Sequence, residues 1–179
     1  MAKARFAQLG EGEHMAKDNS FDVVSEVDLQ EVDNAYQQTR KELTQRYDLK
    51  GSGATIEFDK AAGKITVQAP SEFVARQVID VLNTRLVKRQ VELSAIKWGK
   101  PVDASGMTVR MEGAIISGID QDTSRKINKD IKARKYKAKV TIEGDKLRVS
   151  SPSRDTLQEI IAFLKEQDYG LPLQFTNYR

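Results

Sequence analysis

The sequence KITVQAPS at positions 64–71 is followed 82 residues later by KLRVSSPS at positions 146–153. In both copies apolar and polar residues alternate and then meet Pro-Ser, which predicts a half-buried strand that leads into a helix. Ser71 and Ser153 can each cap that helix, because a serine hydroxyl accepts a hydrogen bond from a backbone N–H group of the first turn. The repeat therefore predicts two similar modules in one chain.

The residues around each copy predict the same elements in the same order. Apolar residues recur at helical spacing after each Pro-Ser pair, at Val74, Val78, Val81 and Leu82 and again at Leu157, Ile160, Ile161 and Leu164. An alternating strand and a tight turn precede each repeated strand, which together predict a hairpin. The predicted elements are strands near 21–27, 55–58, 65–69 and 93–98 with helices at 28–46 and after 71, then strands near 107–111, 138–142, 147–149 and 173–175 with helices at 121–134 and after 153.

The order β-α-β-β-α-β is typical of the ferredoxin-like (RNP-like) module, in which helices cover one face of an antiparallel sheet. We therefore predict an α+β protein (an α/β sandwich) built from two such modules in tandem. We expect the modules at residues 21–98 and 107–179, with a linker at 99–106 and a disordered leader or added extension at 1–20. The lengths of the segments also permit the modules to exchange an outer strand.

The composition argues against most enzyme classes. The 179-residue chain has no cysteine, and His14 in the leader is its only histidine. This excludes disulfides, thiol catalysis and cysteine-based zinc sites, and it disfavours histidine-based acid–base catalysis. We expect no enzymatic activity, no cofactor and no metal. The sequence also holds no run of 18 apolar residues, so we expect no transmembrane helix and no membrane association. The lack of cysteine fits a reducing cytoplasm, where we expect the protein to be located.

Positive charge is concentrated in the second half of the chain. Residues 1–98 carry a net charge of −1 and residues 99–179 a net charge of +4. Residues 125–139 contain eight Lys or Arg against Asp130 alone, which creates a field that attracts phosphate groups. The lysines that we consider for binding in this segment are Lys126, Lys129 and Lys132. The alternative is an ordinary solvated helix face.

Strand alternation predicts which side chains lie on the sheet face that no helix covers. In the second module these include the cations Arg110, Lys139 and Arg148, together with Thr141 and Ser150. In the first module they are Thr55, Glu57, Thr66 and Gln68. Cations and hydroxyls suit a phosphate-bearing ligand, so Arg110, Lys139, Arg148 and Ser150 are candidate nucleotide contacts. The alternative is a polar face with cross-strand pairs to Glu112 or Glu143.

Several common nucleotide and nucleic-acid motifs are absent. The repeated strands lack the aromatic residues on which RNA-recognition motifs stack bases. No P-loop and no Gly-x-Gly-x-x-Gly sequence occurs. Arg85 and Arg89 form an Arg-x-x-x-Arg pattern of the kind seen in some cyclic-dinucleotide receptors, and they are weaker candidates because chance predicts about one such pair. The alternative is a structural role, because cations at the C-terminal end of a helix interact favourably with the helix dipole.

Several segments resemble one bacterial family. They are FDVVSEVD at 21–28, RYDLKG at 46–51, KINKDIK at 126–132, LRVS at 147–150 with SRD at 153–155, and PLQFTNYR at 172–179. In this order they are similar to the YajQ family, over nearly the whole chain. The resemblance implies tandem RNP-like domains in a cytoplasmic bacterial protein without enzymatic activity. It also implies nucleotide binding, with some members acting as cyclic di-GMP effectors that contact transcription factors or DNA.

The sequence thus leads to two functional hypotheses. The first is a non-catalytic nucleotide-binding protein, a cyclic di-GMP or related nucleotide effector that acts through partner macromolecules. The alternative is an RNA- or DNA-binding module that uses the basic segment 125–139.

Overall fold

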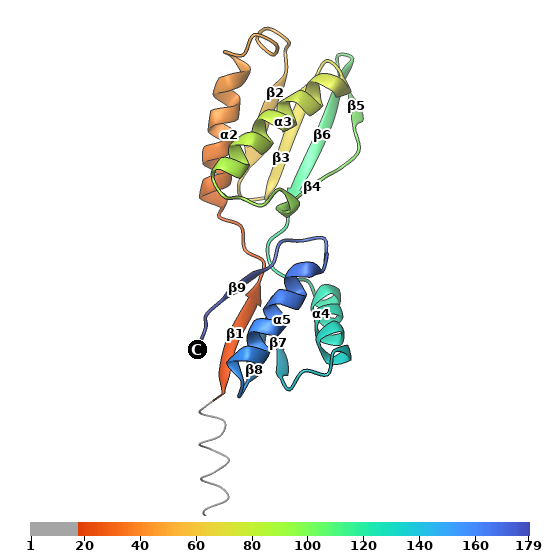
Figure 1. Cartoon of the computed structure of the whole chain (residues 1–179). Coiled ribbons are helices and arrows are strands. Elements are labelled where there is room, and N and C mark those ends of the chain that lie inside the picture. The colour runs from red at the N-terminus through yellow and green to blue at the C-terminus, as the bar shows by residue number, and fades with distance from the viewer. Residues whose placement is uncertain (1–17) are drawn as a thin grey trace, which may run out of the picture. The chain divides into compact units, whose positions relative to one another are not determined.

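The computed structural model describes residues 18–179, which form two compact units (Figure 1). Residues 27–117 make up one, here called the inserted unit. Residues 18–26 and 118–179 make up the other, here called the end unit. Each unit combines an antiparallel sheet with two α-helices, so the predicted α+β fold is confirmed. The expectation of a disordered leader falls largely outside the described residues, and the part that is described begins a strand at Asn19.

The inserted unit contains two helices over one face of its sheet (Figure 1). The helices are α2 (Leu29–Leu43) and α3 (Glu72–Lys88). The sheet has the order β2 (Thr55–Asp59), β3 (Lys64–Ala69), β6 (Thr108–Ile115) and β4 (Ile96–Trp98), and β5 (Val102–Ala104) pairs with β6; a 3-10 turn, η1 (Leu93–Ala95), precedes β4. Ile65 and Val67 point into the core between sheet and helices, as the alternation in β3 predicts.

The end unit has the same architecture. Its sheet has the order β7 (Lys139–Glu143), β8 (Lys146–Ser151), β1 (Asn19–Val24) and β9 (Gln174–Thr176). The helices α4 (Gln121–Ala133) and α5 (Arg154–Glu166) cover one face of this sheet (Figure 1). Leu147 and Val149 of β8 and Phe21 and Val23 of β1 are fully buried beneath them.

The expected modules at 21–98 and 107–179 allowed for the exchange of an outer strand, and the strand pairing shows such an exchange. The strand β1 pairs with β8 and β9 rather than with β3, and β6 pairs with β3 rather than with β8. The first strand of the N-terminal half, β1, is therefore part of the sheet of the C-terminal half, and the first strand of the C-terminal half, β6, is part of the sheet of the N-terminal half. The expected linker at 99–106 contains β5, which pairs with β6 inside the inserted unit. The physical reason is core filling, because Phe21 and Val23 complete the apolar core of the end unit.

The two Pro-Ser pairs behave as the repeat predicts. The Ser71 hydroxyl accepts a hydrogen bond of 3.2 Å from the N–H of Val74, and the Ser153 hydroxyl accepts one of 3.2 Å from Thr156. Both serines are therefore N-caps, an interaction worth about 1 kcal/mol each. No helix within residues 18–179 has the length and apolar character needed to cross a membrane.

Candidate functional site

The sheet face of the end unit opposite its helices brings together three of the predicted residues. Leu147 and Val149 point toward the helices, so Arg148 and Ser150 point the other way. The pairing of β7 with β8 sets Lys139 opposite Ser150 on this open face. Lys139, Arg148 and Ser150 therefore share one surface, as strand alternation predicts.

A buried carboxylate holds Arg148 on this face. Asp22 of β1 lies opposite Arg148 and is only 3% exposed. Its Oδ1 atom accepts a hydrogen bond of 3.1 Å from Arg148 Nε, and its Oδ2 atom lies 3.5 Å from Lys146 Nζ. Arg148 Nη1 also lies 3.7 Å from a carboxylate oxygen of Glu143. The charges of Lys146 and Arg148 are thus balanced by acidic groups of the same sheet.

The electrostatics of Asp22 follow from these contacts. Burial alone would raise the pKa of Asp22, because the charged form loses hydration. The hydrogen bond from Asn177, the hydrogen bond and charge of Arg148 and the charge of Lys146 outweigh burial and hold the pKa of Asp22 below its ordinary value of 3.8. The hydrogen bond to Asp22 in turn raises the pKa of Arg148 above its ordinary value. Both groups are therefore charged at neutral pH.

A second row of side chains crosses the open face without acidic partners. Ser20 and Arg179 exchange two backbone hydrogen bonds of 3.1 and 3.0 Å, so they lie directly opposite each other and share a face. Ser20 in turn lies opposite Ser150, and Ser150 opposite Lys139. The row runs from a lysine through two hydroxyls to an arginine. Within residues 18–179 neither Lys139 nor Arg179 forms an ion pair with Asp or Glu.

A β-bulge places Arg179 in this row. Thr176 lies opposite Asp22, and Arg179 lies opposite Ser20, so Asn177 and Tyr178 together oppose Phe21 alone. Asn177 adopts the left-handed conformation with φ 54° and donates a hydrogen bond of 2.9 Å from Nδ2 to Asp22 Oδ2. Without the extra residue, Tyr178 rather than Arg179 would stand opposite Ser20. Sequence reasoning missed Ser20, Asp22 and Arg179, because each acts through partners that are far away in the chain.

The lysines of the basic segment lie on a different surface. Ile127 and Ile131 of α4 are buried against the helix-covered face of the sheet, and Lys126, Lys129 and Lys132 are exposed. Lys126 Nζ lies 5.7 Å from the centre of the Tyr169 ring. Since α4 covers the face opposite Arg148, the two sets of cations do not form one site.

Arg110 belongs to a different sheet from Lys139 and Arg148, contrary to the sequence-based expectation. It belongs to β6 in the inserted unit, opposite Gln68, and its Nε lies 3.5 Å from a carboxylate oxygen of Glu112. The expectation followed from assigning residues 107–111 to the second module, and the strand exchange removes that assignment.

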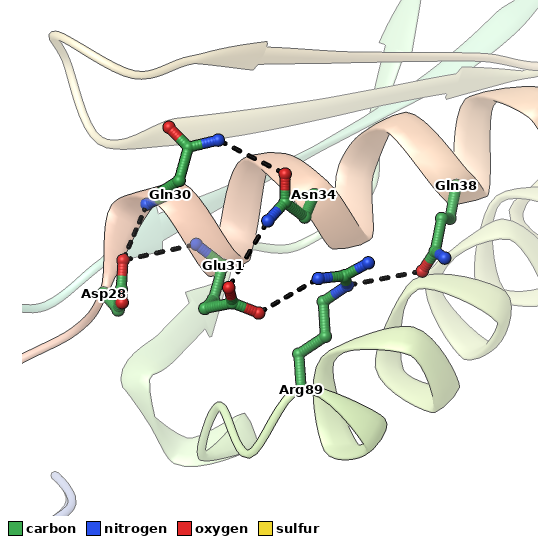
Figure 2. Close-up of polar contacts among 6 residues, drawn as sticks. All are labelled: Asp28, Gln30, Glu31, Asn34, Gln38 and Arg89. Atoms are coloured by element: carbon green, nitrogen blue, oxygen red, sulfur yellow. Dashed lines mark hydrogen bonds and ion pairs between the residues drawn. The ribbon is translucent and has the colours of Figure 1, made fainter.

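Arg85 and Arg89 connect α3 to α2. Arg89 Nη1 lies 3.1 Å from Glu31 Oε2, and Arg89 Nε donates to the Gln38 side chain, as Figure 2 shows. Arg85 forms an ion pair with Glu42. Figure 2 also shows Asp28, which caps α2 by accepting from two backbone N–H groups. Both arginines of the Arg-x-x-x-Arg pattern are therefore engaged inside the inserted unit.

Within the part of the chain that the structure describes, no group of three or more acidic or histidine side chains gathers as metal ligands would. The arrangement instead offers cations and hydroxyls, which are groups that bind anions.

Comparisons with known proteins identify a family and several relatives that match nearly the whole chain. The family described as "Nucleotide-binding protein YajQ-like" matches residues 19–179. A "Nucleotide-binding protein" of Desulfitobacterium hafniense (strain DSM 10664 / DCB-2) is 48% identical over 92% of this chain and 100% of its own length. Proteins with the same name from Alkaliphilus oremlandii (46% identical) and Chloroherpeton thalassium (40% identical) have the same coverage. With a match across both units, the chain belongs to the YajQ-like nucleotide-binding protein family.

Proposed function

We propose that this protein binds a nucleotide without catalysis and that Lys139, Ser150, Ser20 and Arg179 contact the phosphates. The observation that carries the proposal is this row on the open face of the end unit, with a cation at each end and two hydroxyls between them. Hydroxyls donate to phosphate oxygens, lysine supplies a point charge, and the arginine fork can grip two oxygens at once. The names of the relatives support a nucleotide as the ligand.

Arg148 has a secondary place in this proposal. Its guanidinium is already bound to Asp22 and lies near Glu143, so a phosphate would have to share it. Lys139 and Arg179 have no such competitor within residues 18–179 and are the stronger phosphate ligands of the proposal.

The spacing of the row favours a ligand with more than one phosphate. Lys139 and Arg179 are separated by three strand spacings, or about 14 Å between backbones. Cyclic di-GMP is the nucleotide that we propose first, because its two phosphates are held apart by the riboses of its ring, whereas those of GTP and ATP are directly linked. We further propose that the protein acts in the cytoplasm and passes the signal to a partner macromolecule such as a transcription factor.

Isothermal titration calorimetry with cyclic di-GMP, GTP and ATP tests the proposal. Lys139→Ala and Arg179→Ala should each weaken binding by about 1.5–3 kcal/mol, the value of a hydrogen bond to a charged group. Lys97→Ala is the matched control, since Lys97 is an exposed strand lysine of the inserted unit. Wild-type protein that binds none of the three nucleotides would refute the proposal, and unchanged affinity in both variants would refute the phosphate row.

Nucleic-acid binding is the second candidate function, and the exposed lysines of α4 support it. Binding through several lysines releases counterions, so the affinity for RNA or DNA should fall steeply as the salt concentration rises. In a plot of log affinity against log salt concentration, each contacted phosphate contributes about 0.7–0.9 to the negative slope. Replacing Lys126, Lys129 and Lys132 by Gln should reduce that slope by about two to three units. A flat salt response of the wild type would exclude this candidate, whereas a dinucleotide on the open face should show a shallow slope.

A further inference from the structure

A cavity of about 300 Å³ lies in the end unit between the first turns of α5 and the strand segments that carry the phosphate row. Ser20 and Arg179 line it and are also the last two members of that row. Its other lining residues are Asn19, Arg154, Leu157, Gln158 and Tyr178. Because α5 covers the sheet face opposite the row, the cavity and the row lie on the two sides of the sheet, and the Ser20–Arg179 pair at the β9 edge borders both.

The ring of Tyr178 is available to a ligand at this cavity. Its centre lies 6.4 Å from the Phe21 ring at an interplanar angle of 38°, so Phe21 supports the ring from the core. Tyr178 is nevertheless 61% exposed. An aromatic ring held from one side and open on the other is a stacking surface for a planar group. The Asn177 bulge sets this arrangement, because the extra residue leaves Tyr178 beside Phe21 while Arg179 pairs with Ser20.

Arg154 supplies hydrogen-bond donors at the same cavity. Its Nε donates to Asn19 Oδ1 at 3.1 Å, which fixes the direction of the side chain. The guanidinium has five donors in all, and within residues 18–179 it forms no ion pair with a carboxylate. A planar group with two adjacent acceptor atoms, such as the N7 and O6 edge of guanine, matches two parallel guanidinium donors.

We propose that this cavity receives the base of the nucleotide, stacked on Tyr178 with its acceptor edge toward Arg154, while the rest of the ligand passes round the edge strand β9 so that its phosphates reach the Arg179 end of the row on the open face. This inference rests on the proposed function and names the base subsite of the same site. A volume of about 300 Å³ is at the lower end of ligand cavities, which suits one base with its sugar and phosphates outside. The donor-only fork of Arg154 selects guanine over adenine, since adenine presents an N6 donor where guanine presents the O6 acceptor.

Calorimetry with GTP and ATP on three tyrosine variants tests the subsite. Tyr178→Ala should weaken GTP binding by about 5- to 150-fold, the range for a base on an aromatic side chain, and Tyr178→Phe should bind within about 3-fold of wild type. Tyr47→Ala is the matched control, because Tyr47 of the inserted unit is fully exposed and should leave the affinity unchanged. GTP should bind wild type more tightly than ATP, and Arg154→Ala should remove that preference.

A second measurement is independent of affinity. Leu157 lines the cavity, so its methyl NMR signals should shift in the ring current of a bound base at saturating GTP, whereas the methyl signals of Leu82 in the inserted unit should stay in place. If GTP binds to wild type but Tyr178→Ala binds it equally well, or if the Leu157 signals do not move at saturation, the subsite is refuted and the proposed function stands. If wild type binds no nucleotide, both are refuted. If Tyr178→Ala loses affinity and Lys139→Ala does not, the subsite is supported and the phosphate row is refuted.

Discussion

Asn177 and Asp22 are 155 positions apart in the chain, yet the amide of Asn177 donates a hydrogen bond of 2.9 Å to the buried carboxylate of Asp22. This contact satisfies one oxygen of Asp22 and fixes a residue in the left-handed conformation, which Asn tolerates better than most side chains. Arg148 binds the other oxygen. One carboxylate therefore holds both a cation of the open face and the bulge that positions Tyr178 and Arg179.

Asp22→Asn should destabilise the protein. The substitution keeps the shape of the side chain but removes the charge that Arg148, Lys146 and Asn177 share, so we expect a loss of about 2–3 kcal/mol in the free energy of unfolding. Urea denaturation of wild type and variant measures the difference. Asp80→Asn, at an exposed position of α3, is the matched control and should change stability by less than about 0.5 kcal/mol. Equal stability of the Asp22 and Asp80 variants would contradict the role of this carboxylate.

The contribution of Asp22 should depend on pH in a defined direction. Its pKa in the folded state lies below the ordinary value of 3.8, so the ionised group stabilises the fold above that pH. This stabilisation should be lost as the pH falls below about 3.8 through the lower pKa of the folded state. The stability difference between wild type and Asp22→Asn should therefore be constant from pH 5 to 7 and shrink below about pH 4. A stability difference between wild type and Asp22→Asn that grows on acidification would contradict this prediction.

Arg148→Ala should affect stability more than ligand binding. Removing the guanidinium leaves Asp22 with Lys146 and Asn177 as partners, and we expect a loss of about 1.5–3 kcal/mol in unfolding free energy. Nucleotide affinity should fall less than in Lys139→Ala, because Arg148 is already bound to carboxylates of its own sheet. Denaturation and calorimetry on the same preparations compare the two effects. An affinity loss larger than that of Lys139→Ala would make Arg148 the principal phosphate ligand.

Arg89→Ala should leave nucleotide binding unchanged. Its side chain bridges α3 to Glu31 and Gln38 of α2, and such a half-exposed pair contributes about 0.5–1 kcal/mol (Figure 2). A double-mutant cycle with Glu31→Gln measures this coupling. Weaker nucleotide binding in a folded Arg89→Ala variant would restore the Arg-x-x-x-Arg pattern as a candidate site.

The local features of the fold could be predicted from the sequence, and the pairing of strands could not. Ser71 and Ser153 cap their helices as the repeat indicates, since capping depends on residues three positions apart. Phe21 and Val23 show the alternation of a half-buried strand, but alternation does not say which sheet the strand joins. The predicted position of Arg110 was wrong for the same reason: its strand pairs with β3 and so belongs to the sheet of the inserted unit.

The same limit applies to the candidate site. Alternation along one strand places Arg148 and Ser150 on the open face, and both lie there. The partner of Arg148 is Asp22, 126 positions away, and no local spacing links the two. For Tyr178 one signal was available, since an Asn directly before it favours the left-handed backbone of a bulge.

The strand exchange has a consequence for a chain that is being synthesised. Asn19–Val24 leaves the ribosome early, but its partner strands Lys146–Ser151 and Gln174–Thr176 are among the last to appear. Residues 27–117 are consecutive, so the inserted unit can complete its sheet before the rest of the chain has been synthesised. At that stage both edges of β1 are unpaired and its apolar side chains are exposed. If translation stops early or a protease removes the last strands, the edges of β1 stay unpaired. We expect chaperones and proteases to recognise such an incomplete chain even when the inserted unit has folded correctly.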